Sequence, residues 1–173
     1  LRDHLRQELL ALGFGQLGPA TWLSPYDHSA EVFRLAWDLG LQERIQAFHA
    51  RLDGLTKPRT LVARYWDLAK TNQKHAEFLA LHRTRLEEYR LAHGNGGATS
   101  PQWCFVERFL LVHNYRRHRY YDPQLPPELL PKPWLGNEAQ AFFKNYYDLL
   151  AEPAQSYVDS LFEGCPGESG RGP

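Results

Sequence analysis

The sequence contains no methionine, only two cysteines, and no excess of charge of either sign. Cys104 and Cys165 are far apart, and twenty basic residues balance twenty acidic ones in the 173-residue chain. Two isolated cysteines exclude a disulfide framework and a cysteine-based metal site. Zero net charge excludes a strong overall attraction to nucleic acid or to an anionic membrane. The chain has no apolar run long enough to cross a bilayer and no signal-peptide pattern, so we expect a cytoplasmic protein with no membrane partner.

The missing methionine extends to the first position of the chain. Leucines recur at helical spacing from the start, at Leu1, Leu5, Leu9 and Leu12. A chain that begins inside an amphipathic helix is typical of a fragment, so we expect a further segment upstream.

Residues 1–55 have the pattern of a small α/β module. The expected elements are a helix that ends at Gly13, a strand over residues 20–23, a helix capped by Ser29, and a second strand from Ile45 to Leu52. This order lacks an opening strand, which we expect upstream of Leu1.

Residues 56–164 have the apolar periodicity of an all-helical domain rich in aromatic residues. Ser100 followed by Pro101 predicts a capped helix start, and the glycines among residues 94–97 predict a flexible loop. Another helix is expected from Asn137 and a last one from Pro153. Residues 165–173, composed of glycine, proline and charged residues, predict a disordered tail.

Eight histidines raise the possibility of a metal site, but their spacing does not favour one. His75 and His82 are two helical turns apart, which is too far to bind one ion together. His113 and His118 point to different sides of a helix. We therefore expect no metal and no resident cofactor, and we expect these histidines to pack along half-buried helix edges.

A catalytic site has one weak candidate. Ser24, Asp27 and His28 cluster after the first predicted strand, where α/β proteins often place active sites. Residues of these types more often form turns and helix caps. The turn interpretation is favoured, and a small hydrolase or thioesterase-like enzyme stays an alternative.

The segment from His113 to Tyr121 concentrates basic and aromatic side chains at the end of an apolar helix. Arginine side chains suit phosphate groups, and aromatic rings suit a planar ligand. The segment suits an acyl-coenzyme A or a nucleic-acid backbone. Alternatively, Arg116 or Arg117 pairs with Asp122 or Glu128 and braces the proline-rich turn that follows. Residue chemistry leaves both interpretations open.

The motifs follow one another in a specific order. A Gly-Phe-Gly turn and a Ser-Pro pair lie in residues 12–25, and Trp-Asp-Leu occupies residues 66–68. The later motif consists of His113, Tyr115, Arg116, Arg117, Asp122, Pro123, Leu125, Pro126, Leu129, Leu130, Pro131, Trp134 and Gly136. Over nearly the whole chain, this order resembles the PaaX-like family of bacterial transcriptional repressors of phenylacetic acid catabolism.

The resemblance implies a three-part protein with a winged helix-turn-helix, a central ferredoxin-like domain and a helical C-terminal domain. The chain matches the last two parts. The implied fold class is α+β, with a ferredoxin-like α/β module followed by an all-helical C-terminal module. Family members typically respond to an aryl-acetyl-coenzyme A such as phenylacetyl-coenzyme A, and they act as dimers. Residues 118–121 are more polar and aromatic than the family pattern, which bears on the identity of the effector.

We therefore predict the effector-sensing and dimerising part of a PaaX-like transcriptional regulator, and not an enzyme. The expected partners are a second copy, an acyl-coenzyme A effector, and operator DNA through a winged helix-turn-helix absent from this chain. The predicted ligand-binding residues are His113, Tyr115, Arg116, Arg117, Trp66 and Trp134. The arginines are expected at the phosphates, and Trp66, Tyr115 and Trp134 at the aryl or adenine ring. A ligand-free structural dimerisation module is a further alternative.

Overall fold

The computed structural model describes residues 1–51, 53–54, 56–94 and 99–163, which form two compact units. The first unit consists of residues 1–75 and 117–136. The second consists of residues 76–116 and the chain from Asn137 onward. The chain thus passes from the first unit to the second, returns, and passes to the second again. The division falls within helix α4 (Leu68–Gly94), so this helix contributes to both units.

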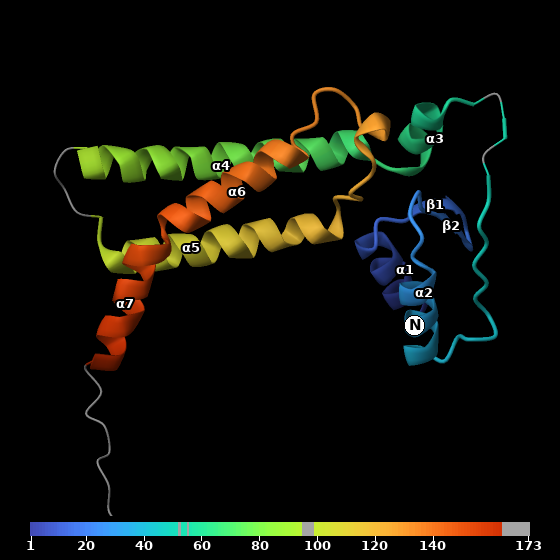
Figure 1. The fold of residues 1–173 in the computed structure, drawn as a ribbon, viewed down its shortest axis with the longest axis horizontal. Helices are drawn as coiled ribbons and strands as arrows, with labels where there is room; N and C mark the ends of the chain where they lie inside the picture. The colour runs from blue at the N-terminus through green and yellow to red at the C-terminus, as the bar shows by residue number, and fades with distance from the viewer. Residues whose placement is uncertain (52, 55, 95–98, 164–173) are drawn as a thin grey trace, which may run out of the picture. The chain divides into compact units, whose positions relative to one another are not determined.

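The first unit contains a hairpin and several short helices (Figure 1). Its elements are α1 (Arg2–Ala11), β1 (Gly15–Gly18), β2 (Thr21–Leu23), α2 (Ser29–Asp38), α3 (Pro58–Tyr65), the start of α4, most of the 3-10 helix η1 (Arg116–Tyr120), and the 3-10 helix η2 (Pro127–Leu129). Strands β1 and β2 pair in antiparallel fashion, with Gly15 opposite Leu23 and Gln16 opposite Trp22. Helices and one small antiparallel sheet therefore make up this unit.

The hairpin both confirms and corrects the sequence-based expectation. The predicted strand at residues 20–23 forms as β2, but its partner β1 was not expected. The second strand predicted from Ile45 to Leu52 is wrong over residues 45–51, which are neither helix nor strand. Residue 52 lies outside the described residues. Phe48 is 81% exposed, so this segment has neither a neighbouring strand nor a packed face to hold it extended.

The start of α2 also differs by one residue from the prediction. His28 occupies the N-cap position, and Ser29 is the first helical residue. The side chain of Asp27 accepts a hydrogen bond from the Ser29 backbone N–H at 2.9 Å. Asp27 therefore satisfies the helix start that was assigned to the serine.

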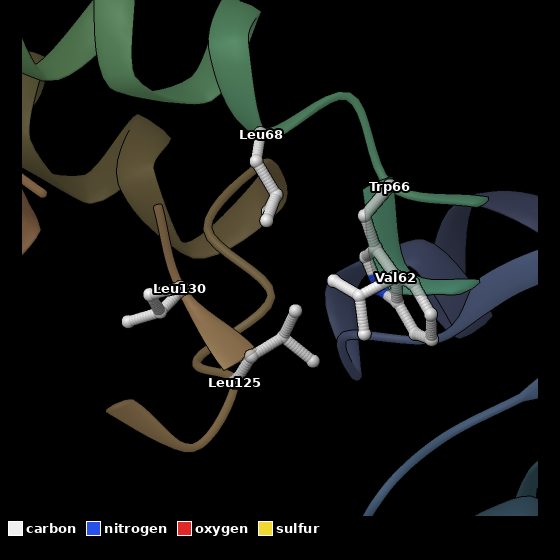
Figure 2. Close-up of a cluster of buried hydrophobic side chains, with 5 residues drawn as sticks. All are labelled: Val62, Trp66, Leu68, Leu125 and Leu130. Carbon is white, nitrogen blue, oxygen red and sulfur yellow. The ribbon is translucent and has the colours of Figure 1, made fainter. Parts of the chain in front are cut away.

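The core of the first unit joins segments that are distant in sequence. Val62, Trp66, Leu68, Leu125 and Leu130 are buried together, as Figure 2 shows. Leu23, Tyr65, Leu129 and Trp134 pack around them and are partly buried. Two leucines of the proline-rich segment therefore belong to the same apolar core as α3 and the start of α4.

The second unit is helical, with the remainder of α4, α5 (Pro101–Tyr115), nearly all of α6 (Gly136–Leu149) and α7 (Ala151–Glu163). Helices α4, α5 and α6 lie side by side (Figure 1), and α7 packs against α5. Ser100 caps α5 by accepting a hydrogen bond from the Trp103 N–H, which confirms the predicted start. Leu111, Tyr146 and Leu150 are at most 1% exposed and form part of the interior.

Three other expectations concern segments that are only partly described. Of the flexible loop predicted at residues 94–97, Gly94 instead ends α4, and residues 95–97 lie outside the described residues, as does the predicted tail 165–173. The expected domain boundary at residues 55 and 56 falls between α2 and α3 and stays a prediction, since residue 55 is also outside them. Among the described helices, none combines the length and apolar character needed to cross a membrane.

Candidate functional site

The predicted ligand-binding residues fall into both units. His113, Tyr115 and Arg116 belong to the second unit, whereas Arg117, Trp66 and Trp134 belong to the first. Each group is therefore described within its own unit.

A buried histidine lies at the centre of the first group. His75, on the first turns of α4, is 1% exposed. Its ring stacks on the ring of His118 at a centroid distance of 4.7 Å and meets Trp134 edge-on at 5.3 Å. Its Nε2 lies 3.1 Å from Oδ2 of Asp122, which is ion-pair distance but outside hydrogen-bond geometry. The partner of Asp122 is thus a histidine and not one of the arginines.

Asp122 also shapes the turn that follows it. Its Oδ1 accepts a hydrogen bond from the Gln124 N–H at 2.9 Å, and Gln124 has a φ of 48°. A non-glycine residue in this left-handed region needs support from its surroundings. Asp122 therefore connects helix α4 to the proline-rich turn with its two oxygen atoms.

Two polar residues of α4 hold the rest of this segment, which we call the proline corner (residues 121–136). Asn72 donates from Nδ2 to the Pro133 carbonyl at 3.1 Å and accepts the Leu135 N–H at 2.8 Å. The Thr71 hydroxyl lies 3.2 Å from the Tyr121 carbonyl that it donates to. The first turns of α4 therefore fix the proline corner at both its ends.

Close approaches explain the glycines of the motifs. The Trp66 indole N–H donates to the Gly13 carbonyl at 2.9 Å, and a Cβ on Gly15 would lie 2.6 Å from the same ring. Gly13 has a φ of 85°, and a Cβ there would lie 2.6 Å from the Pro123 carbonyl oxygen. These motifs, separated by up to 110 residues, contact one another.

The two tryptophans are therefore part of this packing. Trp66 is 8% exposed, with its N–H bonded to the backbone. A Cβ on Gly136 would lie 2.5 Å from the Trp134 Nε1, so the glycine allows the Trp134 ring to lie beside its backbone. Both rings have most of their surface in contact with the fold.

The second group is more open. Tyr115 stacks on Phe143 with centroids 4.0 Å apart and an interplanar angle of 12°. Both rings line a shallow depression of about 440 Å³, whose other residues are Asn137, Gln140, Ala141 and Lys144. His113 is exposed, and its ring lies parallel to that of Phe109 at 6.4 Å.

The arginines at the end of α5 are exposed. Within the part of the chain that the structure describes, neither Arg116 nor Arg117 makes an ion pair. The alternative pairing with Asp122 or Glu128 is not formed, because Asp122 faces His75. The Glu128 carbonyl accepts a hydrogen bond from Arg59 at 2.6 Å. Charged guanidinium groups without a protein partner are available to an anionic ligand.

A second buried polar cluster lies inside the helical unit and was missed by sequence reasoning. His82 Nδ1 lies 3.2 Å from Oε1 of Glu107, and both side chains are 2% exposed. The other ring nitrogen lies 3.2 Å from Nδ2 of Asn114. Because an amide nitrogen donates, Nε2 accepts and Nδ1 carries the proton that it donates to Glu107. Such burial excludes a substrate, so this cluster supports the fold.

Three histidines thus differ from the prediction that they would lie at half-buried edges. His75, His82 and His118 are at most 6% exposed. His75 and His82 lie at helical spacing with the apolar residues Phe78, Leu79 and Leu86, and this periodicity was the available signal that they would be buried. Among residues 1–163 that the structure describes, no three His, Cys, Asp or Glu side chains converge to hold a metal ion.

The candidate catalytic residues have local structural roles. Ser24 Oγ accepts a hydrogen bond from the Tyr26 N–H at 3.1 Å, which closes a turn. Hydrogen bonds from Ser29 lower the pKa of Asp27 from its usual value. The turn and cap interpretation is the one that these contacts support.

Two family models match the chain. Residues 1–62 match the central Cas2-like domain of the PaaX protein, and residues 66–160 match the C-terminal domain of PaaX-like proteins. Together they span both predicted modules.

Individual proteins that the chain is similar to include a curated relative and a solved structure. The transcriptional repressor PaaX of Escherichia coli strain K12 is 30% identical over 167 residues, covering 95% of this chain and 52% of the repressor. The chain thus spans about half the length of this relative. An uncharacterized protein from Mycobacterium tuberculosis has a similar fold, with a TM-score of 0.55 and 23% identity, over 90% of this chain and 56% of its own.

Proposed function

This chain belongs to the PaaX family, and on that premise we propose that it is the effector-sensing and dimerising part of a transcriptional repressor. Support comes from the two family matches and from the interlocked motifs of the first unit. Contacts with operator DNA would come from a winged helix-turn-helix outside this chain. The protein would work in the cytoplasm, as a homodimer and without catalytic chemistry.

We also propose that residues 1–62 belong to a ferredoxin-like module. The Cas2-like family match and the helix–hairpin–helix order support this assignment. Phe33 and Trp37, one turn apart on α2, are 52% and 72% exposed, an apolar surface that a larger sheet would cover. In a chain extended upstream, amide exchange over residues 29–38 should be slower. Unchanged exchange there would count against the module.

For the effector, we propose an aryl-acyl-coenzyme A, phenylacetyl-coenzyme A or a close relative. The exposed guanidinium groups of Arg116 and Arg117 supply charge for phosphates, with His113 beside them. Tyr115, over the depression that Lys144 also lines, supplies a surface for a planar ring. Trp66 and Trp134, predicted from sequence to bind a ring, are assigned here to the packing of the first unit.

Isothermal titration calorimetry with phenylacetyl-coenzyme A tests this assignment. Arg116→Ala and Arg117→Ala should each weaken binding about tenfold, because each removes a charge-assisted contact of about 1.4 kcal/mol. Arg6→Ala, on the exposed side of α1, is the matched control and should leave affinity unchanged.

The same experiment separates the competing functions. Unchanged affinity in both arginine variants would remove them from the site. Hydrolysis of the thioester by the purified chain would indicate the enzyme instead. If no coenzyme A thioester binds at all, the chain is a structural dimerisation module.

A further inference from the structure

A row of stacked aromatic rings lies between α5 and α6 in the second unit. The Tyr115 ring stacks on Phe143 at a centroid distance of 4.0 Å, and Phe143 stacks on Tyr147 at 5.6 Å. The Arg108 guanidinium covers the Tyr147 ring at 3.9 Å from its centroid. Arg108 and Tyr115 are two turns apart on α5, and Phe143 and Tyr147 are one turn apart on α6. Because such spacings place residues on one face of a helix, the row follows the line where the two helices meet.

Arg108, at one end of this row, carries a charge without a counter-ion. The residue is half-buried, and its Nε is buried with no hydrogen-bond partner among the described residues. No carboxylate in the described part of the chain forms an ion pair with it, since the neighbouring Glu107 faces His82 instead. Contact with an aromatic face offsets only part of the cost of removing a cation from water. Arg108 is therefore suited to bind an anionic group of a ligand.

The other end of the row opens into the shallow depression of about 440 Å³. Tyr115 and Phe143 give this depression an aromatic surface, and Lys144 supplies a second positive charge. Asn137 and Gln140 contribute two carboxamides, each with donor and acceptor atoms. Aromatic side chains stack on nucleobases, and carboxamides pair with the edge of adenine. These groups together fit an adenine ring that carries a phosphate nearby.

We propose that this row and its depression bind the 3′-phosphoadenosine end of the coenzyme A effector. The adenine lies over Tyr115, with its edge toward Gln140. Arg108 and Lys144 bind the 3′-phosphate, and Arg116 is left for the diphosphate. A phenyl ring has neither a hydrogen-bonding edge nor an attached charge, so the aryl group lies elsewhere. This inference rests on the coenzyme A effector of the proposed function and assigns one end of that molecule to the depression.

Calorimetry of the full chain with phenylacetyl-coenzyme A and with its 3′-dephospho form tests the phosphate contact. The wild type should bind the phosphorylated ligand at least about tenfold more tightly, because the other form lacks the charge-assisted contact. In Arg108→Ala this preference should fall to about twofold or less, and Lys144→Ala should reduce it about threefold. Arg90→Ala removes an exposed arginine of α4 in the same unit and should keep the preference of the wild type.

The ratio of the two affinities separates binding from packing. If Arg108 only braces Tyr147, Arg108→Ala weakens both ligands by the same factor, and the unchanged preference overturns its role at the phosphate. Circular dichroism shows whether Arg108→Ala is folded at the temperature of the titration. Lys144 is exposed, so Lys144→Ala gives a second reading in a variant that keeps the packing of the row. An unchanged preference in Lys144→Ala overturns the phosphate site as drawn.

The adenine end has a test of its own. Adenosine 3′,5′-bisphosphate has no aryl group and no thioester, and it should displace phenylacetyl-coenzyme A competitively. Gln140→Leu should weaken its binding about fivefold, because the base loses a hydrogen-bonding partner. Failure of the bisphosphate to displace the thioester would overturn the assignment of the depression to adenine.

The outcomes also distinguish this inference from the proposed function. Equal affinity of the wild type for phenylacetyl-coenzyme A and its 3′-dephospho form overturns the phosphate site and leaves the effector in place. If neither thioester binds, the effector of the proposed function fails, and this inference fails with it.

Discussion

The first unit buries its motif aromatics, whereas the second unit exposes some of its largest ones. Trp66 lies against two glycines in a core that holds the proline corner, and its ring nitrogen is hydrogen-bonded. On α5, Phe109 is 63% exposed and neighbours no charged residue on the outer face of that helix. Membership of a family motif therefore does not identify a residue as part of a ligand site. The residues that give the family its signature mostly hold the first unit together.

The largest expected effect is loss of a buried aromatic in the first unit. Trp66→Ala should lower the free energy of unfolding by about 3–5 kcal/mol, because it removes a core ring and a hydrogen bond. Phe109→Ala should lower it by less than about 1 kcal/mol. Urea unfolding at a concentration where the chain is monomeric measures both. An equal loss of unfolding free energy in both variants would contradict the stated difference between the buried and the exposed aromatic residues.

The next effect tests the buried charge of the second unit. Glu107→Ala leaves the interior His82 without its acceptor and should lower the free energy of unfolding by about 3 kcal/mol. Glu87→Ala removes an exposed pair with Arg90 and should change it by less than about 0.5 kcal/mol. A small loss for Glu107→Ala in urea unfolding would mean that the pair is dispensable.

A smaller effect is expected at the proline corner. Asp122→Asn removes the charge that faces His75 and keeps an oxygen for the Gln124 N–H, so we expect a loss of about 1–2 kcal/mol. The exposed Asp148→Asn is the matched control. If thermal unfolding shows the two variants to be alike, His75 does not depend on the carboxylate.

Alkaline pH should lower the stability of the second unit more than that of the first. Burial raises the pKa of Cys104, Tyr89 and Tyr146, all within that unit. A group whose pKa is raised by folding stabilises the fold below its unfolded pKa, and this stability is lost as the pH rises. The loss of stability therefore begins above about pH 8.5, the usual pKa of a thiol. It continues as the pH rises through the range in which tyrosines ionise.

Amide exchange from pH 8 to pH 11, corrected for the intrinsic effect of pH, would locate this loss. Exchange in α5 and α6 should accelerate more than in α3, and Tyr146→Phe should reduce the difference. Uniform acceleration of both units would contradict this expectation.

Local signals predicted most helices, and longer-range contacts account for the errors. Ser100 and Pro101 fix the start of α5 by backbone chemistry that is confined to one turn, so the sequence predicts it. A strand depends on a partner, and no neighbour was visible for residues 45–52. The β-like pattern of this segment therefore predicted a strand that residues 45–51 do not form. The strand β2 does form, because its partner β1 lies only a few residues upstream.

The site was predicted in part for the same reason. Sequence identified the proline corner as a distinctive segment, and one of its two open interpretations paired Asp122 or Glu128 with an arginine. The actual partner of Asp122 is His75, which is 47 residues away on another helix. Charge alone makes an arginine a more expected partner for a carboxylate than a histidine. Only the fold determines which of these side chains lies close to Asp122. The exposure of Arg116 and Arg117 likewise follows from where α5 ends.

The contrast between the two units can be tested by amide exchange with and without phenylacetyl-coenzyme A. The proposed effector site predicts slower exchange at residues 113–116 and 137–144, with residues 66–75 and 121–135 unchanged. Protection confined to residues 66–75 and 121–135 would contradict this account, because it would place the ligand on the residues that we assign to packing.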